Sequence, residues 1–276
     1  MNAVAGAAPA GRPPFDAARH RRLFVPVIFA LAALAWLALW IWGRSPYARY
    51  VDHGSWMASE PAAFLCRVVP GGGTLVPFAL YAAAWILMTA AMMLPTTLPL
   101  FSAFDRLTAG RADHGRLLLL LGFGYLTVWA VFGLVAHPLH DALLYLIDRV
   151  PLLALNAWMI GAAIIALAGA FQFSALKHRC LEKCRTPLSF VIEHWRGGGA
   201  RRQALLLGLH HGIFCVGCCW AIMLLMFVVG TGSVGWMLAL GAVMAIEKNH
   251  KWGHHLSAPL GAGLLASAGA VVALNV

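Results

Sequence analysis

Long apolar runs alternate along this chain with short segments that carry most of its charged residues. Seven of the runs have roughly the 17 to 25 residues that an α-helix needs to cross a bilayer. They cover residues 23–43, 76–100, 117–136, 152–173, 203–229, 232–247 and 256–274. The pattern predicts an all-α, polytopic membrane bundle of about seven transmembrane helices. The segment 137–151 is amphipathic and too short to span, so we expect it at the membrane interface.

The composition supports a membrane protein and excludes a soluble enzyme. Of 276 residues, 61% are hydrophobic and only 11% are charged. An apolar surface of this size would aggregate in water unless lipid covered it, so membrane lipid is an expected partner. The first 20 residues are rich in Ala, Gly and Pro, which predicts a disordered cytoplasmic tail over residues 1–22. Residues 23–276 are expected to form a single transmembrane domain.

The formal net charge of +10 could indicate nucleic-acid binding, so the positions of the basic residues matter. When the segments between runs are assigned to alternate sides, 16 Lys and Arg fall on the side of the N-terminus and 4 on the other. This asymmetry predicts a cytoplasmic N-terminus and an external C-terminus. The same distribution argues against nucleic acid as a partner, because the basic residues mark the leaflet whose anionic headgroups attract them.

The run 203–229 carries the most informative residues of the chain. His211, Cys215, Cys218 and Cys219 fall within an arc of about 100° when each helical residue turns by 100°. Thiolates with an imidazole suit Cu(I) best and Zn(II) second, so these four residues are candidate metal ligands. The alternative is packing, because cysteine is a small hydrophobe that is often buried. Three cysteines and a histidine on one arc favour the functional interpretation.

Two further pairs are candidate ligands. Met92 and Met93 lie at a depth similar to that of His211 if 76–100 and 203–229 run antiparallel, although methionine is also ordinary core filler. Cys180 and Cys184 are an i,i+4 pair on a short helical stretch of the predicted cytoplasmic loop 174–202. Nearby Lys and Arg lower the pKa of thiols, which suits a metal-receiving or redox pair. These cations are equally expected at an inner leaflet, so a structural role for the pair stays open.

The remaining polar residues are less informative. Glu247 and Lys248 are expected to pair with each other at the inner membrane boundary, and Cys66 lies alone on the outer side. The sequence contains no Ser/His/Asp set, phosphate-binding loop or dinucleotide motif, so it does not indicate an enzyme.

Taken together, these motifs resemble a bacterial family described as predicted metal-binding integral membrane proteins, sometimes labelled copper-chaperone-like. The resemblance covers about residues 75 to 255. It rests on 91–95 (AMMLP), 176–187 (LKHRCLEKCRTP), 194–198 (HWRGG), 208–220 (GLHHGIFCVGCCW) and 247–248 (EK). It implies a multi-pass protein of the bacterial cytoplasmic (inner) membrane that binds a metal ion.

The favoured hypothesis is therefore a Cu(I)-handling membrane protein that acts in delivery, export or maturation of a cuproenzyme. Its partners would be the metal ion and a copper-dependent enzyme or a soluble metallochaperone. One alternative is a membrane thiol-disulfide oxidoreductase that uses two of the clustered cysteines. Another is a non-catalytic scaffold subunit of a membrane complex, in which the cysteines serve only packing.

Overall fold

A computed structural model describes residues 17–44, 75–150, 156–196, 198–229 and 233–276. Every regular element in these ranges is helical, which confirms the all-α fold class. The elements are α1 (Ala17–Gly43), α2 (Leu75–Met93), η3 (Pro95–Thr97), α3 (Leu98–Thr108), α4 (His114–Arg149), α6 (Ala157–Phe171), α7 (Ala175–Arg185), α8 (Pro187–His194), α9 (Ala200–Val229), α10 (Val234–Asn249), η4 (Gly253–Leu256) and α11 (Ser257–Asn275). Cys66 and residues 1–16 of the predicted tail lie outside the described residues.

Two predicted spans in the N-terminal half of the chain differ from the observed helices. Helix α1 begins at Ala17, whereas the apolar pattern placed the start of the first span at residue 23. The predicted span 76–100 is broken, because Ala82–Met93 and Pro95–Thr108 are bent by 45° relative to each other. Pro95 has no N–H to donate and its ring opposes a continuous helix, which explains the break at this point.

The predicted interfacial segment 137–151 is wrong as a separate element. Helix α4 continues through Pro138 and ends at Arg149, so it has 36 residues. At 1.5 Å per residue it is about 54 Å long, which exceeds the thickness of a hydrocarbon layer of roughly 30 Å. The amphipathic segment is therefore the C-terminal part of a long helix. The prediction ended the helix where the polarity of the sequence changes, but the helix itself continues.

The predicted cytoplasmic loop 174–202 is largely folded into helices. Ser174 caps α7 by accepting a hydrogen bond from the backbone N–H of Lys177, at 3.1 Å. Trp158–Phe171 and Ala175–Arg185 are bent by 62° relative to each other, and α7 packs against α9. Pro187 then begins α8. One face of α7 is therefore buried in a segment that the sequence placed at the surface.

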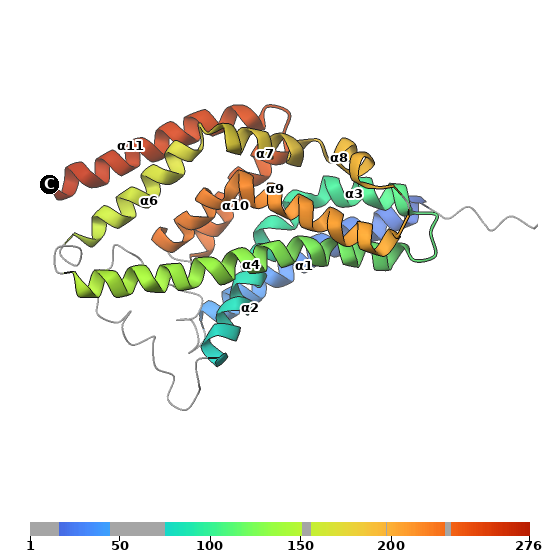
Figure 1. The fold of residues 1–276 in the computed structure, drawn as a ribbon, viewed down its shortest axis with the longest axis horizontal. Coiled ribbons are helices and arrows are strands. Elements are labelled where there is room, and N and C mark those ends of the chain that lie inside the picture. The colour runs from blue at the N-terminus through green and yellow to red at the C-terminus, as the bar shows by residue number, and fades with distance from the viewer. Residues whose placement is uncertain (1–16, 45–74, 151–155, 197, 230–232) are drawn as a thin grey trace, which may run out of the picture.

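Helix α9 is the centre of the bundle, with α4, α7, α6 and α10 against it (Figure 1). Glycines allow the closest approach, which is between α4 and α9. A Cβ atom on Gly208 would lie 2.1 Å from the carbonyl oxygen of Leu121, and one on Gly124 would lie 2.4 Å from that of Leu205. Small residues at a helix contact permit such spacing. Gly208 and Gly124 are therefore packing requirements of the contact between α4 and α9.

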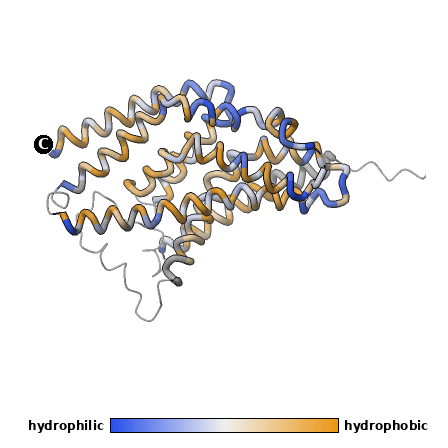
Figure 2. Tube along the Cα trace, in the orientation of Figure 1, coloured by the Kyte–Doolittle hydropathy of each residue, from blue (hydrophilic) through white to orange (hydrophobic). Residues whose placement is uncertain are grey.

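The helices are compatible with a membrane location. Within the described residues, four helices are long and apolar enough to cross a bilayer, or six if each bent pair forms one span. All seven predicted runs correspond to helices, but α10 has only 16 residues. Apolar side chains cover the outside of the bundle, such as Leu119, which is 76% exposed. Figure 2 shows hydrophobic residues along the helices and hydrophilic ones gathered at the helix ends and around α7.

Candidate metal site

Five cysteines from two helices meet in the core of the bundle. Cys215, Cys218 and Cys219 come from α9, and Cys180 and Cys184 from α7. Cys184, like the other four, is buried in the core cluster that surrounds α9. The predicted loop pair and the predicted intramembrane triplet thus form one cluster.

Gly217 permits this meeting of helices. A Cβ atom at residue 217 would lie 2.7 Å from the Sγ atom of Cys180, closer than real side chains approach. With hydrogen in place of a methyl group, α7 can bring Cys180 directly onto the face of α9 that carries Cys218. The glycine inside the cysteine motif is therefore a packing requirement of the cluster.

The three cysteines of α9 are buried on one face of the helix, as their spacing predicted. The thiol of Cys218 donates to the carbonyl oxygen of Cys215 at 3.1 Å, and that of Cys219 donates to the same oxygen at 2.9 Å. Cys215 Sγ has different neighbours, because Tyr125 Oη of α4 lies 3.1 Å from it. Sequence reasoning missed Tyr125, since an aromatic residue in an apolar run looks like any other core residue.

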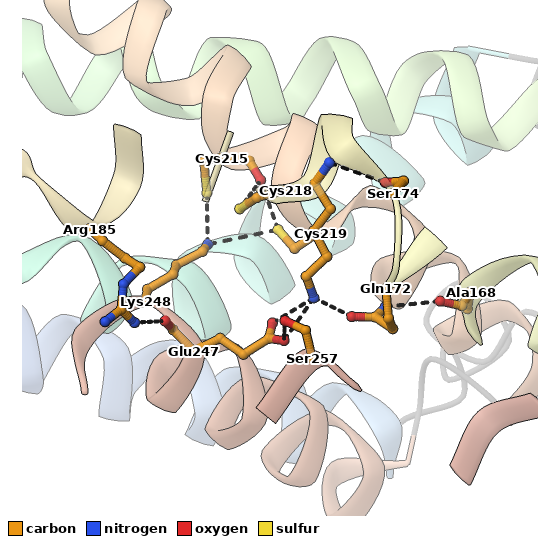
Figure 3. Close-up of polar contacts among 11 residues, drawn as sticks. Ala168, Gln172, Ser174, Arg185, Cys215, Cys218, Cys219, Glu247, Lys248 and Ser257 are labelled. Atoms are coloured by element: carbon orange, nitrogen blue, oxygen red, sulfur yellow. Dashed lines mark hydrogen bonds and ion pairs between the residues drawn. The ribbon is translucent and has the colours of Figure 1, made fainter. Parts of the chain in front are cut away.

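Lys248 is the second residue that sequence reasoning missed at this site. Its ammonium group donates to Cys215 Sγ at 3.0 Å and approaches Cys219 Sγ at 3.7 Å. Figure 3 shows the side chain pointing toward these two sulfurs, away from the carboxylate of Glu247. The expectation that Glu247 and Lys248 pair with each other is wrong. Consecutive residues of a helix are about 100° apart, so their side chains leave α10 in different directions.

Glu247 instead binds a lysine of α7. Lys177 Nζ lies 2.7 Å and 2.9 Å from the two carboxylate oxygens of Glu247. Ser257 of α11 donates to the same carboxylate at 2.7 Å, and Gln172 accepts from Lys177. Arg185 donates to the backbone carbonyl of Glu247. This network ties α7, α10 and α11 together and fixes the direction in which the next residue of α10 points.

The two candidate methionines are not equivalent. Met93 Sδ lies 3.8 Å from Lys248 Nζ, at the edge of the sulfur cluster. Met92 is also buried but faces α10, where a Cβ atom on Gly241 would lie 3.8 Å from its Cβ. The structure therefore places Met93 beside Lys248 and Met92 against α10.

His211 is buried one helical turn away from Cys215. Its ring lies between those of Tyr125 and Phe190, with centroid distances of 6.1 Å and 5.5 Å. Its Nδ1 atom has no hydrogen-bond partner among the described residues. The imidazole borders the sulfur cluster without entering it.

The cluster is not arranged as a preformed metal centre. Within the part of the chain that the structure describes, no three His, Cys, Asp or Glu side chains converge in a way that could hold a metal ion. Two thiols point at the Cys215 carbonyl, and an ammonium group lies between the sulfurs. For sulfurs to bind an ion together, these thiols must rotate and the Lys248 ammonium must move aside.

Comparison with known protein families assigns the chain to one of them. Residues 82–271 match the family PpoB2, described as a copper chaperone. This range contains every described cysteine, Met92, Met93, His211 and Lys248. No curated protein and no solved structure matches the chain. Since the match spans well over half of the chain, the protein belongs to this copper chaperone family. Copper is the metal that the family indicates, in agreement with the first choice made from the sequence.

Proposed function

We propose that this protein binds Cu(I) through its five clustered cysteines, in the cytoplasmic membrane of a bacterium, and passes the ion on to a copper-requiring partner. Copper is cargo here and not a resident cofactor. The observation that carries the proposal is that Cys180 and Cys184 of α7 are buried in the same cluster as the three cysteines of α9. Soft sulfur donors favour Cu(I) over harder divalent ions.

A gradient of burial suggests an order of binding. Cys180 and Cys184 are each 8% exposed, whereas the three cysteines of α9 are at most 1% exposed. An ion that arrives from the side of α7 meets the first pair before the deeper three. Because all five sulfurs belong to one cluster, the ion can move by exchanging one sulfur ligand for another without entering water. Transfer to a cuproenzyme, to a metallochaperone or across the membrane would use the same exchange.

Cu(I) affinity of the purified protein tests the proposal. The protein is purified anaerobically in mild detergent and titrated against a chromogenic Cu(I) chelator. Changing Cys215, Cys218 and Cys219 together to Ser should abolish high-affinity binding, because hydroxyl groups are poor ligands for Cu(I). Cys180→Ser with Cys184→Ser should weaken binding less, since the deeper sulfurs remain. Equal copper binding by the parent and the triple variant would overturn the proposal.

The two methionines supply a matched control. Met93→Leu should weaken Cu(I) binding, because it removes the thioether beside Lys248 and the cysteines. Met92→Leu changes a neighbouring buried thioether that faces α10, so it should leave binding as in the parent. His211→Phe keeps a ring between Tyr125 and Phe190 and tests whether the imidazole takes part. A loss of binding in Met92→Leu as large as in Met93→Leu would contradict the position assigned to Met93.

The membrane orientation has its own test. Seven spans with a cytoplasmic N-terminus place the C-terminus outside, whereas four or six spans place both ends on one side. An alkaline phosphatase fused after residue 276 should be active, because this enzyme folds only outside the reducing cytoplasm. A fluorescent-protein fusion at the same point should be dark. The opposite pair of results would indicate an even number of spans.

A further inference from the structure

Lys248 brings a buried positive charge into the cysteine cluster. The residue is only 5% exposed, and its ammonium lies 3.0 Å from Cys215 Sγ, 3.7 Å from Cys219 Sγ and 3.8 Å from Met93 Sδ. Burying an ammonium group is unfavourable unless an anion or a set of acceptors compensates it. Among the described residues, the acceptors that contact its ammonium are sulfur atoms.

In the part of the chain that the structure describes, no carboxylate pairs with this charge. Among the described residues, Lys248 forms no ion pair with Asp or Glu, and the neighbouring Glu247 is bound by Lys177. Glu247 and Lys177 cancel each other's charge within a buried network. The charge of Lys248 therefore has to be balanced by the sulfurs of the cluster and by whatever they bind.

This charge restricts the valence of a bound metal ion. The two cysteine sulfurs nearest the ammonium are those of Cys215 and Cys219. When both are ionised they carry a charge of −2, and Lys248 reduces the total to −1. A monovalent ion then makes the buried site neutral, whereas a divalent ion leaves an excess of +1 in a region where uncompensated charge is costly. Without Lys248 the balance reverses, because two thiolates are neutralised by a divalent ion.

We infer that Lys248 is a specificity-determining residue, which makes the cysteine cluster select a soft monovalent metal ion over a divalent one such as Zn(II). The inference rests on the proposed binding of Cu(I) by these cysteines. Lys248 acts through its charge, since a protonated amine has no lone pair with which to ligate a metal. The Lys177–Glu247 pair positions it, because it anchors the preceding residue of α10 and so fixes the direction in which the Lys248 side chain leaves the helix.

The ratio of Cu(I) affinity to Zn(II) affinity tests this role. Both ions are titrated separately into the full chain in detergent, each against a chelator of known affinity. Lys248→Gln should shift the ratio toward Zn(II) at least tenfold, while Lys248→Arg, which keeps the charge, should stay within threefold of the wild type. Lys183→Gln is the matched control, because Lys183 is 45% exposed and pairs only loosely with Glu193, at 3.4 Å. Its ratio should not change.

The outcomes separate the inference from the proposed function. A wild type that binds no Cu(I) overturns both. A wild type that binds Cu(I), together with a Lys248→Gln ratio that is unchanged or shifted toward Cu(I), overturns only the role of Lys248. If Lys248→Gln does not give a monodisperse protein, Lys248→Leu replaces it as the neutral variant. The same shift toward Zn(II) is then expected, because leucine removes the charge and adds no ligand.

Discussion

Lys177 and Lys248 are both buried ammonium groups, yet their surroundings differ. Lys177 is 0% exposed and lies between a carboxylate and an amide oxygen, so its charge is cancelled by hard, fixed acceptors. Lys248 is surrounded by soft sulfur atoms, of which Cys215 Sγ is closest. The charge of Lys177 is neutralised by a carboxylate, and this pair ties three helices together. The charge of Lys248 is compensated only by sulfur atoms, which can also bind a soft cation. The comparison separates a structural charge from a charge that belongs to the site.

The largest expected effect comes from breaking the structural pair. Glu247→Gln leaves the Lys177 ammonium buried without its anion, and breaking such a pair by removing one partner typically costs about 3–5 kcal/mol. The free energy of unfolding, measured by chemical denaturation in mild detergent, should fall by this amount. Changing Lys177→Met together with Glu247→Gln removes both charges and should recover much of the loss. A double variant no more stable than the single one would show that the network matters through packing and not through charge.

A smaller loss of unfolding free energy is expected when only the surroundings of Lys248 and Cys215 are disturbed. Gly208→Ala places a methyl group 2.1 Å from the Leu121 carbonyl oxygen, which forces α4 away from α9. Overpacking of this kind costs about 1–3 kcal/mol. Because α4 carries Tyr125, the contact with Cys215 should loosen while the Lys177 pair stays intact. Gly269→Ala is the control, since nothing lies within 4 Å of the added methyl group. Equal destabilisation by both variants would contradict the close contact between α4 and α9.

Cys215→Ser probes the sulfur environment of Lys248 directly. The serine hydroxyl can still accept a hydrogen bond, and Cys219 and Met93 remain near the ammonium. The free energy of unfolding should therefore fall by about 1 kcal/mol, the usual net worth of one hydrogen bond. A loss as large as that of Glu247→Gln would mean that Cys215 is as strong a counterion to Lys248 as Glu247 is to Lys177.

The smallest effect is expected for an exposed pair outside the helices. Arg111 Nε donates to Asp113 at 2.9 Å and lowers the pKa of that carboxyl group. A lowered pKa adds stability above the carboxyl's ordinary pKa, and this contribution disappears as the pH falls through the lowered value. Asp113→Asn should hardly change the melting temperature at neutral pH and should slightly reduce its decline in acid. A shift at neutral pH comparable to that of Glu247→Gln would contradict a merely superficial role for Asp113.

Much of the fold was predictable because lipid-facing helices need long apolar runs, and each of the seven runs corresponds to a helix. The errors arose where polarity and helix boundaries do not coincide. Helix α4 continues through the amphipathic segment to Arg149, and α7 is a polar helix with one face packed against α9. Hydropathy alone cannot show that a polar helix buries one face, since the decisive contact is with a helix distant in sequence.

The residues of the site were likewise predictable only in part. Spacing along one helix was enough to place Cys215, Cys218 and Cys219 on one face of α9, because a helix fixes the angle between its own residues. It could not show that Cys180 and Cys184 are buried in the same cluster, or that Met93 lies beside Lys248. Those facts depend on how α2, α7, α9 and α10 pack against one another.

The sequence by itself thus determined the class of the protein, its apolar helices and the residues whose chemistry suits copper. Only the tertiary structure decided the partners of Glu247 and Lys248. The two residues are adjacent in sequence and opposite in charge, which predicts an ion pair between them. Their side chains diverge from the helix, so α7 supplies the partner of one and α9 the partners of the other. Packing decides which groups pair with a buried charge. In a low-dielectric interior, electrostatic attraction is strongest for the group within hydrogen-bonding distance, however far away it is along the chain.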